Sequence, residues 1–267
     1  MSRRKRLGAA AVAAAAVVLS ACSTGVAGQP VADPASSTAT VAVPSADPSA
    51  NVESTWLTIP AEQAAAAPRR ITLTQSATGA PCTAGPAVAA AAAVGHRGYL
   101  TAGHCDQVPG SSVTAGGQAV APYTGTIAGE YGATVTWGAS SASPTVAGRN
   151  VVGVLTREAT QKLDYHTPVC VDAAVSGVRC GVLVDADEDG IGAKVSTVPG
   201  DSGSPMFLVG PRGVVLIGLV EESATPYSYA AYLDPLLAQM GAKALTDRTA
   251  AVDPRTDPRY STATTSQ

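Results

Sequence analysis

Short stretches in which apolar and polar residues alternate recur along the chain from about residue 71 onward. The first is Ile71-Thr72-Leu73-Thr74, and such alternation is the pattern of a half-buried β-strand. Further strand-like runs cover residues 98–101, 133–137, 151–155, 181–184 and 214–220. Turn-forming Gly, Pro, Ser and Asp residues separate them. Many short strands of this kind predict an antiparallel all-β domain, built as a barrel or a sandwich.

Two segments depart from the strand pattern. Alanine propensity alone favours a helix over residues 87–93, but the segment is short and lies between Pro86 and Gly95, so propensity does not decide its structure. Residues 234–245 place apolar side chains at helical spacing, with Pro235 in the first turn. This second segment predicts a closing C-terminal helix.

The two ends of the chain lack a sustained period. Residues 22–70 are rich in Ala, Ser, Thr, Pro and Gly, which predicts a flexible linker. A small pro-domain is the alternative, because short helical turns are possible near residues 61–67. Residues 247–267 are polar and contain two Asp-Pro pairs, so we expect a disordered tail. The folded domain would then span residues 71–246.

Composition and charge narrow the choice of partners. The chain is 46% hydrophobic and 14% charged, which is enough apolar material for a packed core. The formal charge is −3, and removal of the four basic residues at positions 3–6 would bring it to −7. An acidic domain of this kind argues against nucleic acid as a partner.

The amino-terminal residues have the plan of an export signal. A basic stretch, Arg3 to Arg6, precedes an apolar run that is too short to span a bilayer comfortably. The run ends in Leu19-Ser20-Ala21-Cys22 and there resembles a bacterial lipoprotein precursor. That resemblance implies a signal peptide over residues 1–21, acylation of Cys22 and a lipid anchor at the outer face of the cell membrane. The alternative is an ordinary cleavage site beside an incidental Cys.

The remaining cysteines are even in number. If Cys22 is acylated, Cys82, Cys105, Cys170 and Cys180 remain, and an exported protein would normally oxidise them. Four cysteines allow three pairings, so their number alone does not select one.

The strongest chemical signal is Gly200-Asp201-Ser202-Gly203-Ser204-Pro205. A nucleophilic Ser needs an exposed hydroxyl, a base for its proton and N–H donors for the oxyanion. Glycines on both sides allow the backbone to turn sharply. Because all of these residues also form surface turns, the hexapeptide alone does not separate a nucleophile from a turn.

A second signal supplies the base. Thr101-Ala102-Gly103-His104-Cys105 directly follows a predicted strand, and His104 is one of only three histidines, with His96 and His166. A lone His is more often a structural polar residue than a base. Here the His motif precedes the Ser motif by about a hundred residues, which would place each on a different half of one domain.

Together the two motifs resemble those of the chymotrypsin-like serine proteases, closest to the secreted bacterial branch of the streptogrisins and α-lytic protease. The resemblance covers roughly residues 78–245. It implies two six-stranded antiparallel β-barrels, with His104 taking the proton of Ser202 and returning it to the leaving amine. It also implies an oxyanion hole formed by the N–H groups of Gly200 and Ser202.

The same resemblance extends to the cysteines and the partners. It implies the disulfides Cys82–Cys105 and Cys170–Cys180. The expected activity is that of a serine endopeptidase acting on polypeptides, with no metal and no other cofactor. We expect a monomer.

The third catalytic residue is less well marked. The family places an Asp between His and Ser, and the similar context here is Gly129-Glu130-Tyr131-Gly132-Ala133. Glu130 would orient the imidazole in place of Asp, although an extra methylene shifts its carboxylate. The alternatives are that Glu130 is a solvated loop acid, or that Asp106 or Asp164 takes this role.

Ser204 is a second departure, because the familiar motif has Gly at that position.

Activation and specificity are weakly encoded. In the family, Asp201 is usually buried and paired with a cation, which in zymogens is a new N-terminus, so Arg70-Ile71 is a possible cleavage site.

Ser196 stands where trypsin-like members carry the pocket Asp. Glu221, Glu222 and Ser223 follow the strand that lines the pocket in relatives, and a carboxylate there would favour a basic residue before the scissile bond.

An acidic run offers a possible calcium loop. Asp185, Asp187, Asp189 and Gly190 alternate as in Ca²⁺ loops. The twelfth position holds Ser196 rather than Glu, which favours an acidic hairpin turn over a metal site.

Two other functions remain compatible with the sequence. A protease-fold binding protein whose catalysis has decayed would explain the departures at Glu130 and Ser204, but it would need neither His104 nor Ser202. An esterase would use the same Ser–His pair, since acyl transfer chemistry is shared.

Overall fold

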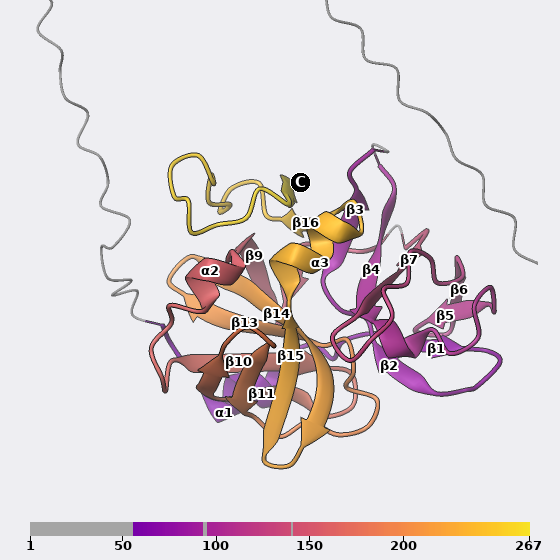
Figure 1. The fold of residues 1–267 in the computed structure, drawn as a ribbon, viewed down its shortest axis with the longest axis horizontal. Coiled ribbons are helices and arrows are strands. Elements are labelled where there is room, and N and C mark those ends of the chain that lie inside the picture. The colour runs from indigo at the N-terminus through magenta and orange to yellow at the C-terminus, as the bar shows by residue number, and fades with distance from the viewer. Residues whose placement is uncertain (1–55, 93–94, 140) are drawn as a thin grey trace, which may run out of the picture. The chain divides into compact units, whose positions relative to one another are not determined.

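The structure is a computed structural model that describes residues 56–92, 95–139 and 141–267 (Figure 1). The predicted signal peptide, the acylated Cys22 and most of the predicted linker lie outside these residues. Among the described residues, no helix is both long enough and apolar enough to cross a membrane.

The second half of the domain is a closed antiparallel barrel of six strands. Around the barrel the strands follow the order β13-β10-β11-β12-β15-β14, and pairing of β13 with β14 closes it. Their bounds are β10 Pro168–Ala173, β11 Gly177–Ala186, β12 Ile191–Lys194, β13 Pro205–Gly210, β14 Gly213–Ala224 and β15 Tyr227–Tyr232. Two more strands, β8 Thr145–Val146 and β9 Arg149–Val154, extend the sheet beyond β14.

Alternating residues of these strands fill the barrel. Its core includes the fully buried Leu183, Ile191, Met206, Leu208 and Ile217. Aliphatic side chains dominate, as the scarcity of aromatic residues requires, and their burial is the main stabilising contribution.

The first half consists of two sheets that share a core. One sheet has the order β2-β1-β5-β6 and the other β17-β16-β3-β4-β7, and Leu73, Tyr99, Val113 and Leu245 pack between them. The bounds are β1 Thr72–Gln75, β2 Pro81–Thr83, β3 Ala87–Ala90, β4 Arg97–Ala102, β5 Val113–Ala115, β6 Gln118–Val120, β7 Ala133–Trp137, β16 Ala242–Thr246 and β17 Thr264–Ser266.

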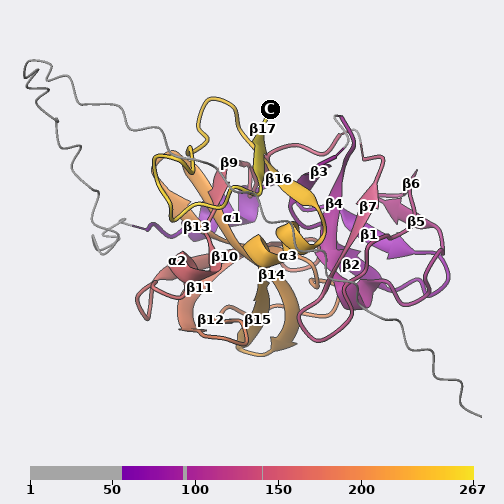
Figure 2. The ribbon, with the colours of Figure 1, turned by 45° about the horizontal axis from the view of Figure 1, so that its top comes forward.

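Figures 1 and 2 show the two halves side by side, with α3 at their junction. The helices are α1 Ala61–Ala66, α2 Arg157–Thr160 and α3 Leu233–Gln239, and the 3-10 turn η1 is Gly103–Cys105. The predicted all-β class with a closed six-stranded barrel is confirmed, and every stretch predicted as a strand overlaps an observed one.

Two local expectations are corrected. Residues 87–90 form β3, because Ala87 and Val88 are buried and β3 pairs with β4 and β16, so tertiary context outweighs alanine propensity. The C-terminal helix ends at Gln239 rather than reaching Leu245. Gly241 adopts a φ of +58° and turns the chain into β16.

The tail 247–267 is not disordered but packs on the barrel. The ring of Tyr260 covers Gly153 so closely that a Cβ there would lie 2.5 Å from Cδ1 of Tyr260. The backbone N–H of Thr156 donates to Arg259 at 2.8 Å, and that of Ser261 donates to Val154 at 2.8 Å. These contacts use backbone groups and one aromatic ring, which a polar composition does not reveal.

Removal of residues 247–267 is therefore expected to lower the free energy of unfolding by about 3 kcal/mol, because one partly buried ring and several hydrogen bonds are lost. Tyr260→Ala should reproduce most of the loss, and Tyr165→Ala, at a side chain that is 63% exposed, should change little. Urea denaturation followed by circular dichroism measures the effect. Superimposable unfolding curves for the truncated and full chains would show that the tail does not stabilise the fold.

Candidate active site

The loop that carries Ser202 has a tightly constrained backbone. Gly200 and Gly203 have φ values of +97° and +87°, which favour glycine. A Cβ at Gly203 would lie 2.0 Å from Oγ1 of Thr101. Thr83 of β2 binds the loop twice, since its N–H donates to Ser202 O at 2.8 Å and its hydroxyl donates to Gly200 O at 3.0 Å. The half-buried Ser202 is thus held against the first half of the domain.

Two N–H groups of this loop have no acceptor among the residues that the structure describes. The N–H of Asp201 donates to Val198 O at 3.0 Å, and that of Gly203 donates to Val220 O at 2.7 Å. Within the described residues, the N–H groups of Gly200 and Ser202 have no hydrogen-bond acceptor. They are the donors assigned above to the oxyanion hole, and they are available to bind an oxygen of a substrate.

Asp201 stabilises the loop from inside. Its side chain is fully buried. One carboxylate oxygen accepts from the N–H groups of Val175 and Ser176, each at 3.1 Å, and the other accepts from Val198 at 2.9 Å. The chain itself therefore satisfies this carboxylate, without a new N-terminus.

Ser204 also turns inward. Its buried hydroxyl donates to Asp201 O at 2.6 Å, and its N–H donates to the same oxygen at 3.0 Å. The hydroxyl that departs from the familiar motif thus closes the turn.

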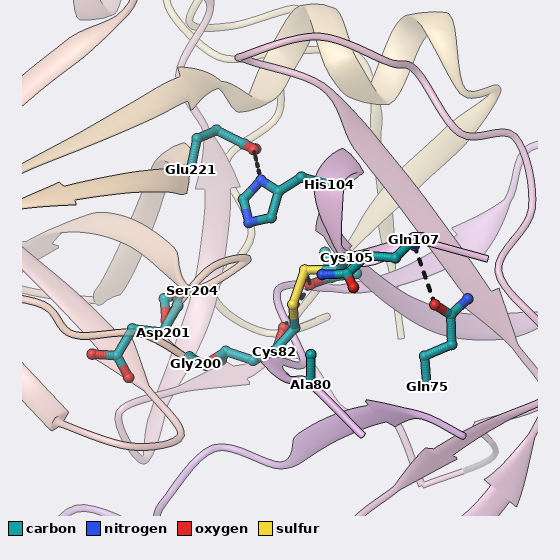
Figure 3. The surroundings of a disulfide bond; sticks show 12 residues. Gln75, Ala80, Cys82, His104, Cys105, Gln107, Gly200, Asp201, Ser204 and Glu221 are labelled. Carbon is teal, nitrogen blue, oxygen red and sulfur yellow. Dashed lines mark hydrogen bonds and ion pairs between the residues drawn. A yellow bond between two sulfur atoms is a disulfide. The ribbon is translucent and has the colours of Figure 1, made fainter. Parts of the chain in front are cut away.

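His104 is positioned by the 3-10 turn after β4 and by a disulfide. Both implied disulfides are present, Cys82–Cys105 and Cys170–Cys180. Cys105 follows His104, and Cys82 precedes Thr83, which binds the Ser202 loop. The disulfide therefore ties the His turn to the strand that holds the nucleophile loop (Figure 3).

The carboxylate beside His104 belongs to Glu221. Its Oε2 lies 3.4 Å from Nδ1 of His104, and the two side chains are 1% and 45% exposed respectively. Figure 3 shows the other ring nitrogen of His104 directed away from Glu221. Among the described residues, the Glu221 carboxylate makes no hydrogen bond of good geometry, so the imidazole is its nearest polar partner.

Burial changes the acidity of Glu221. Loss of hydration raises its pKa to about 7, an effect that the contact with His104 opposes. A carboxylate that titrates near neutrality beside an imidazole is typical of functional sites.

A β-bulge turns Glu221 inward. In the ladder between β14 and β15, Val220 pairs with Ala230 and Glu222 pairs with Tyr229, so Glu221 is the extra residue. Such a bulge changes the direction of a side chain and interrupts strand alternation. Val220 and Glu221 are consequently both buried, although they are adjacent.

The structure does not bring the predicted acid to His104. Glu130 lies exposed in the loop before β7 and forms no ion pair with His104 in the described part of the chain. Asp106 accepts hydrogen bonds from Gln75 at 3.1 Å and from Thr126 at 2.6 Å. Asp164 is an exposed residue between α2 and β10.

The sequence pointed to Glu221 only as an acid of the specificity pocket. In the structure its carboxylate contacts His104 instead. Glu222 and Ser223 remain exposed, and the Ser223 hydroxyl lies 2.5 Å from that of Thr197. The sequence feature that could have indicated a buried Glu221 was its position directly after the apolar run 214–220.

The described residues show no hydrogen bond between Ser202 and His104. Catalytic hydrogen bonds of this kind are often long before a substrate binds. Strand β14 contacts both motifs. The carbonyl of Val220 accepts from the N–H of Gly203, which follows Ser202, and the next residue of the strand, Glu221, contacts His104.

The acidic run 185–190 forms the turn between β11 and β12. One oxygen of Asp187 accepts from the N–H groups of Asp189 and Gly190 at 2.8 and 3.3 Å. These contacts are those of an acidic hairpin turn.

Comparisons with known proteins identify the fold. No protein-family model and no curated protein matches the chain. A solved structure described as a glutamic acid specific serine protease is 18% identical with a TM-score of 0.50, covering 64% of this chain and 96% of that one. The Nocardiopsis protease NAPase (18%, TM-score 0.49, 66% and 97%) and Thermobifida fusca protease A (19%, 0.49, 66% and 96%) are also similar. At 18% identity and a TM-score of 0.50, the likeness to the glutamic acid specific enzyme shows the fold alone, which is that of a serine protease.

Proposed function

We propose that this serine-protease fold carries an active serine endopeptidase that cleaves polypeptides through an acyl-enzyme on Ser202. The observation that carries the proposal is the position of His104. Its Nδ1 faces the buried carboxylate of Glu221, and the Cys82–Cys105 disulfide links its turn to the strand that holds the Ser202 loop. In the described part of the chain, the N–H groups of Gly200 and Ser202 have no acceptor. A nucleophile, a base, an orienting acid and oxyanion donors are the groups that acyl transfer requires.

Each group has one task in the proposed reaction. Nε2 of His104 takes the proton of Ser202 as its Oγ attacks the substrate carbonyl. Glu221 holds Nδ1–H in place and stabilises the imidazolium that forms. The N–H groups of Gly200 and Ser202 stabilise the oxyanion. His104 then protonates the leaving amine, and water hydrolyses the acyl-enzyme with His104 again as base.

We also propose that the domain is exported and held at the outer face of the cell membrane by a lipid on Cys22. The sequence Leu19-Ser20-Ala21-Cys22 supports this location. Two disulfides within the folded domain are in keeping with an oxidising compartment.

A fluorophosphonate probe tests the catalytic proposal directly. The wild type should be labelled, Ser202→Ala should not be labelled, and His104→Ala should be labelled at least about a thousandfold more slowly. His96→Ala, at an exposed histidine stacked on Trp137, is the matched control and should label like the wild type. Labelled protein and its peptides are quantified by mass spectrometry.

Substrate panels separate the related activities. Turnover of peptides as well as small esters supports the endopeptidase, whereas turnover of esters alone indicates an esterase. A folded wild type that is not labelled at all would contradict the proposal and favour a binding protein with this fold.

A further inference from the structure

The nucleophile loop lies between two supporting segments. The first is Thr83, which binds the carbonyls of Gly200 and Ser202. The second is the turn after β10, whose N–H groups at Val175 and Ser176 bind Asp201. Ala174 joins the two segments, because its N–H donates to the hydroxyl of Thr83 at 3.1 Å.

Arg70 contacts residues next to both segments. On the first side its guanidinium donates to the carbonyls of Ala84, at 2.9 Å, and Gly85. On the other side it donates to Thr145 O at 3.0 Å, and its Nε lies 4.0 Å from the carboxylate of Asp172 on β10. A buried cation is tolerated only with such a set of acceptors.

Asp172 depends on Arg70 in turn. Its side chain is 1% exposed. One of its oxygens accepts from the N–H of Ala147 at 2.7 Å, and the other has no hydrogen-bond partner among the described residues. Burial raises the pKa of Asp172, and the charge of Arg70 opposes that rise.

Arg69 supports the turn after β10 directly. Its Nη1 donates to Val175 O at 2.7 Å, and the N–H of Val175 is one of the groups that hold Asp201. The guanidinium lies over Gly177, where a Cβ would be 2.6 Å from Nη1. Of the two adjacent arginines before β1, Arg69 thus contacts one support directly, and Arg70 contacts the residues that follow Thr83 and precede the turn after β10.

We propose that Arg69 and Arg70 are positioning residues for the nucleophile loop, so that the segment before Ile71 belongs to the active form. The inference rests on the proposed function and concerns its regulation. The carboxylate of Asp201 already accepts three backbone N–H groups and needs no new N-terminus. Cleavage between Arg70 and Ile71 would break the covalent link that holds both arginines before β1, and we expect it to lower activity rather than create it.

The first test identifies which form of the chain reacts. The full chain is labelled with a fluorophosphonate, and the labelled species is mapped by mass spectrometry. We expect an intact Arg70–Ile71 bond in the labelled protein. Labelling confined to chains that begin at Ile71 would overturn the inference while leaving the proposed function in place. Absence of labelling in both forms would remove the proposed function and the inference with it.

The second test uses matched arginine variants of the full chain. Arg69→Gln should lower kcat by about 3- to 10-fold with little change in KM, because misplaced catalytic groups mainly affect the chemical step. Arg69→Lys should recover part of this loss. Arg149→Gln is the control, since Arg149 donates to Gln63 of α1 at 2.8 Å and does not contact the loop supports. An equal kcat in the wild type and the Arg69→Gln variant would overturn the role of Arg69.

Arg70 needs a variant that leaves no buried charge unpaired. The double change Arg70→Gln and Asp172→Asn removes both charges together, and circular dichroism verifies its fold. We expect at least a roughly tenfold lower rate of fluorophosphonate labelling. A folded double variant that labels at the rate of the wild type would overturn the role of Arg70.

Discussion

Replacement of Glu221 by Gln is expected to lower kcat by about 10³- to 10⁴-fold, the scale known for an orienting carboxylate in such a triad. Gln has nearly the same shape, but it carries no charge to stabilise the imidazolium of His104. Glu130→Gln is the matched control, because it makes the same chemical change at an exposed acid away from His104. Steady-state turnover of a peptide substrate measures both variants.

The opposite result would be informative. If Glu130→Gln were severely impaired and Glu221→Gln were not, the acid predicted from the sequence motif would be the orienting group in solution. The loop before β7 would then have to move to His104 when substrate binds.

Glu221 should also impose a pH dependence on stability. In the unfolded chain its carboxyl ionises near the ordinary pKa of 4.5, whereas in the folded protein burial raises the pKa to about 7. Between these values the unfolded state loses a proton that the folded state retains, so the free energy of unfolding falls as pH rises. Relative to Glu221→Gln, the wild type should lose about 3 kcal/mol between pH 4.5 and pH above 7. Denaturant unfolding at several pH values measures this difference, and parallel pH profiles would contradict the raised pKa.

Gly203→Ala is expected to lower the labelling rate of Ser202 at least about a hundredfold and to destabilise the domain by roughly 3 kcal/mol or more. The added methyl would lie 2.0 Å from Oγ1 of Thr101 and 2.7 Å from the carbonyl oxygen of Thr83. The loop at Gly203 or the backbone of Thr83 must therefore move. Because the N–H of Thr83 donates to the carbonyl of Ser202, such a movement displaces the nucleophile.

Gly110→Ala separates this clash from backbone strain. Gly110 has a φ of +82°, close to the +87° of Gly203, but a Cβ there would meet nothing within 4 Å. Its replacement should cost only about 1 kcal/mol and leave labelling unchanged. Similar losses in both variants, measured by labelling kinetics and thermal unfolding, would show that strain rather than packing dominates at Gly203.

The parts of the site that the sequence predicted are local motifs. Ser202 and His104 each lie in a short segment whose glycines and neighbouring cysteine identify it without knowledge of distant contacts. Resemblance also supplied both disulfides. These features depend on a few adjacent residues, so strand register and packing do not alter them.

Glu221 could not be predicted in the same way. Its role depends on a one-residue bulge in β14, and a bulge leaves little trace in a pattern of alternating polarity. The packed segments on either side of the predicted domain were missed for a related reason. Tyr260 at one end and Arg70 at the other are fixed by contacts with distant backbone, which a polar or alanine-rich composition does not indicate.

The pairing of β16 with β3 has a consequence for the order of events during synthesis. The first half of the domain completes its larger sheet only with strands from residues 242–246 and 264–266, which are synthesised long after β3 and β4. The amino-terminal half therefore cannot reach its final packing until these two strands have been made. Contacts of such long range also form slowly. Completion of the larger sheet is therefore tied to the synthesis of residues 242–266.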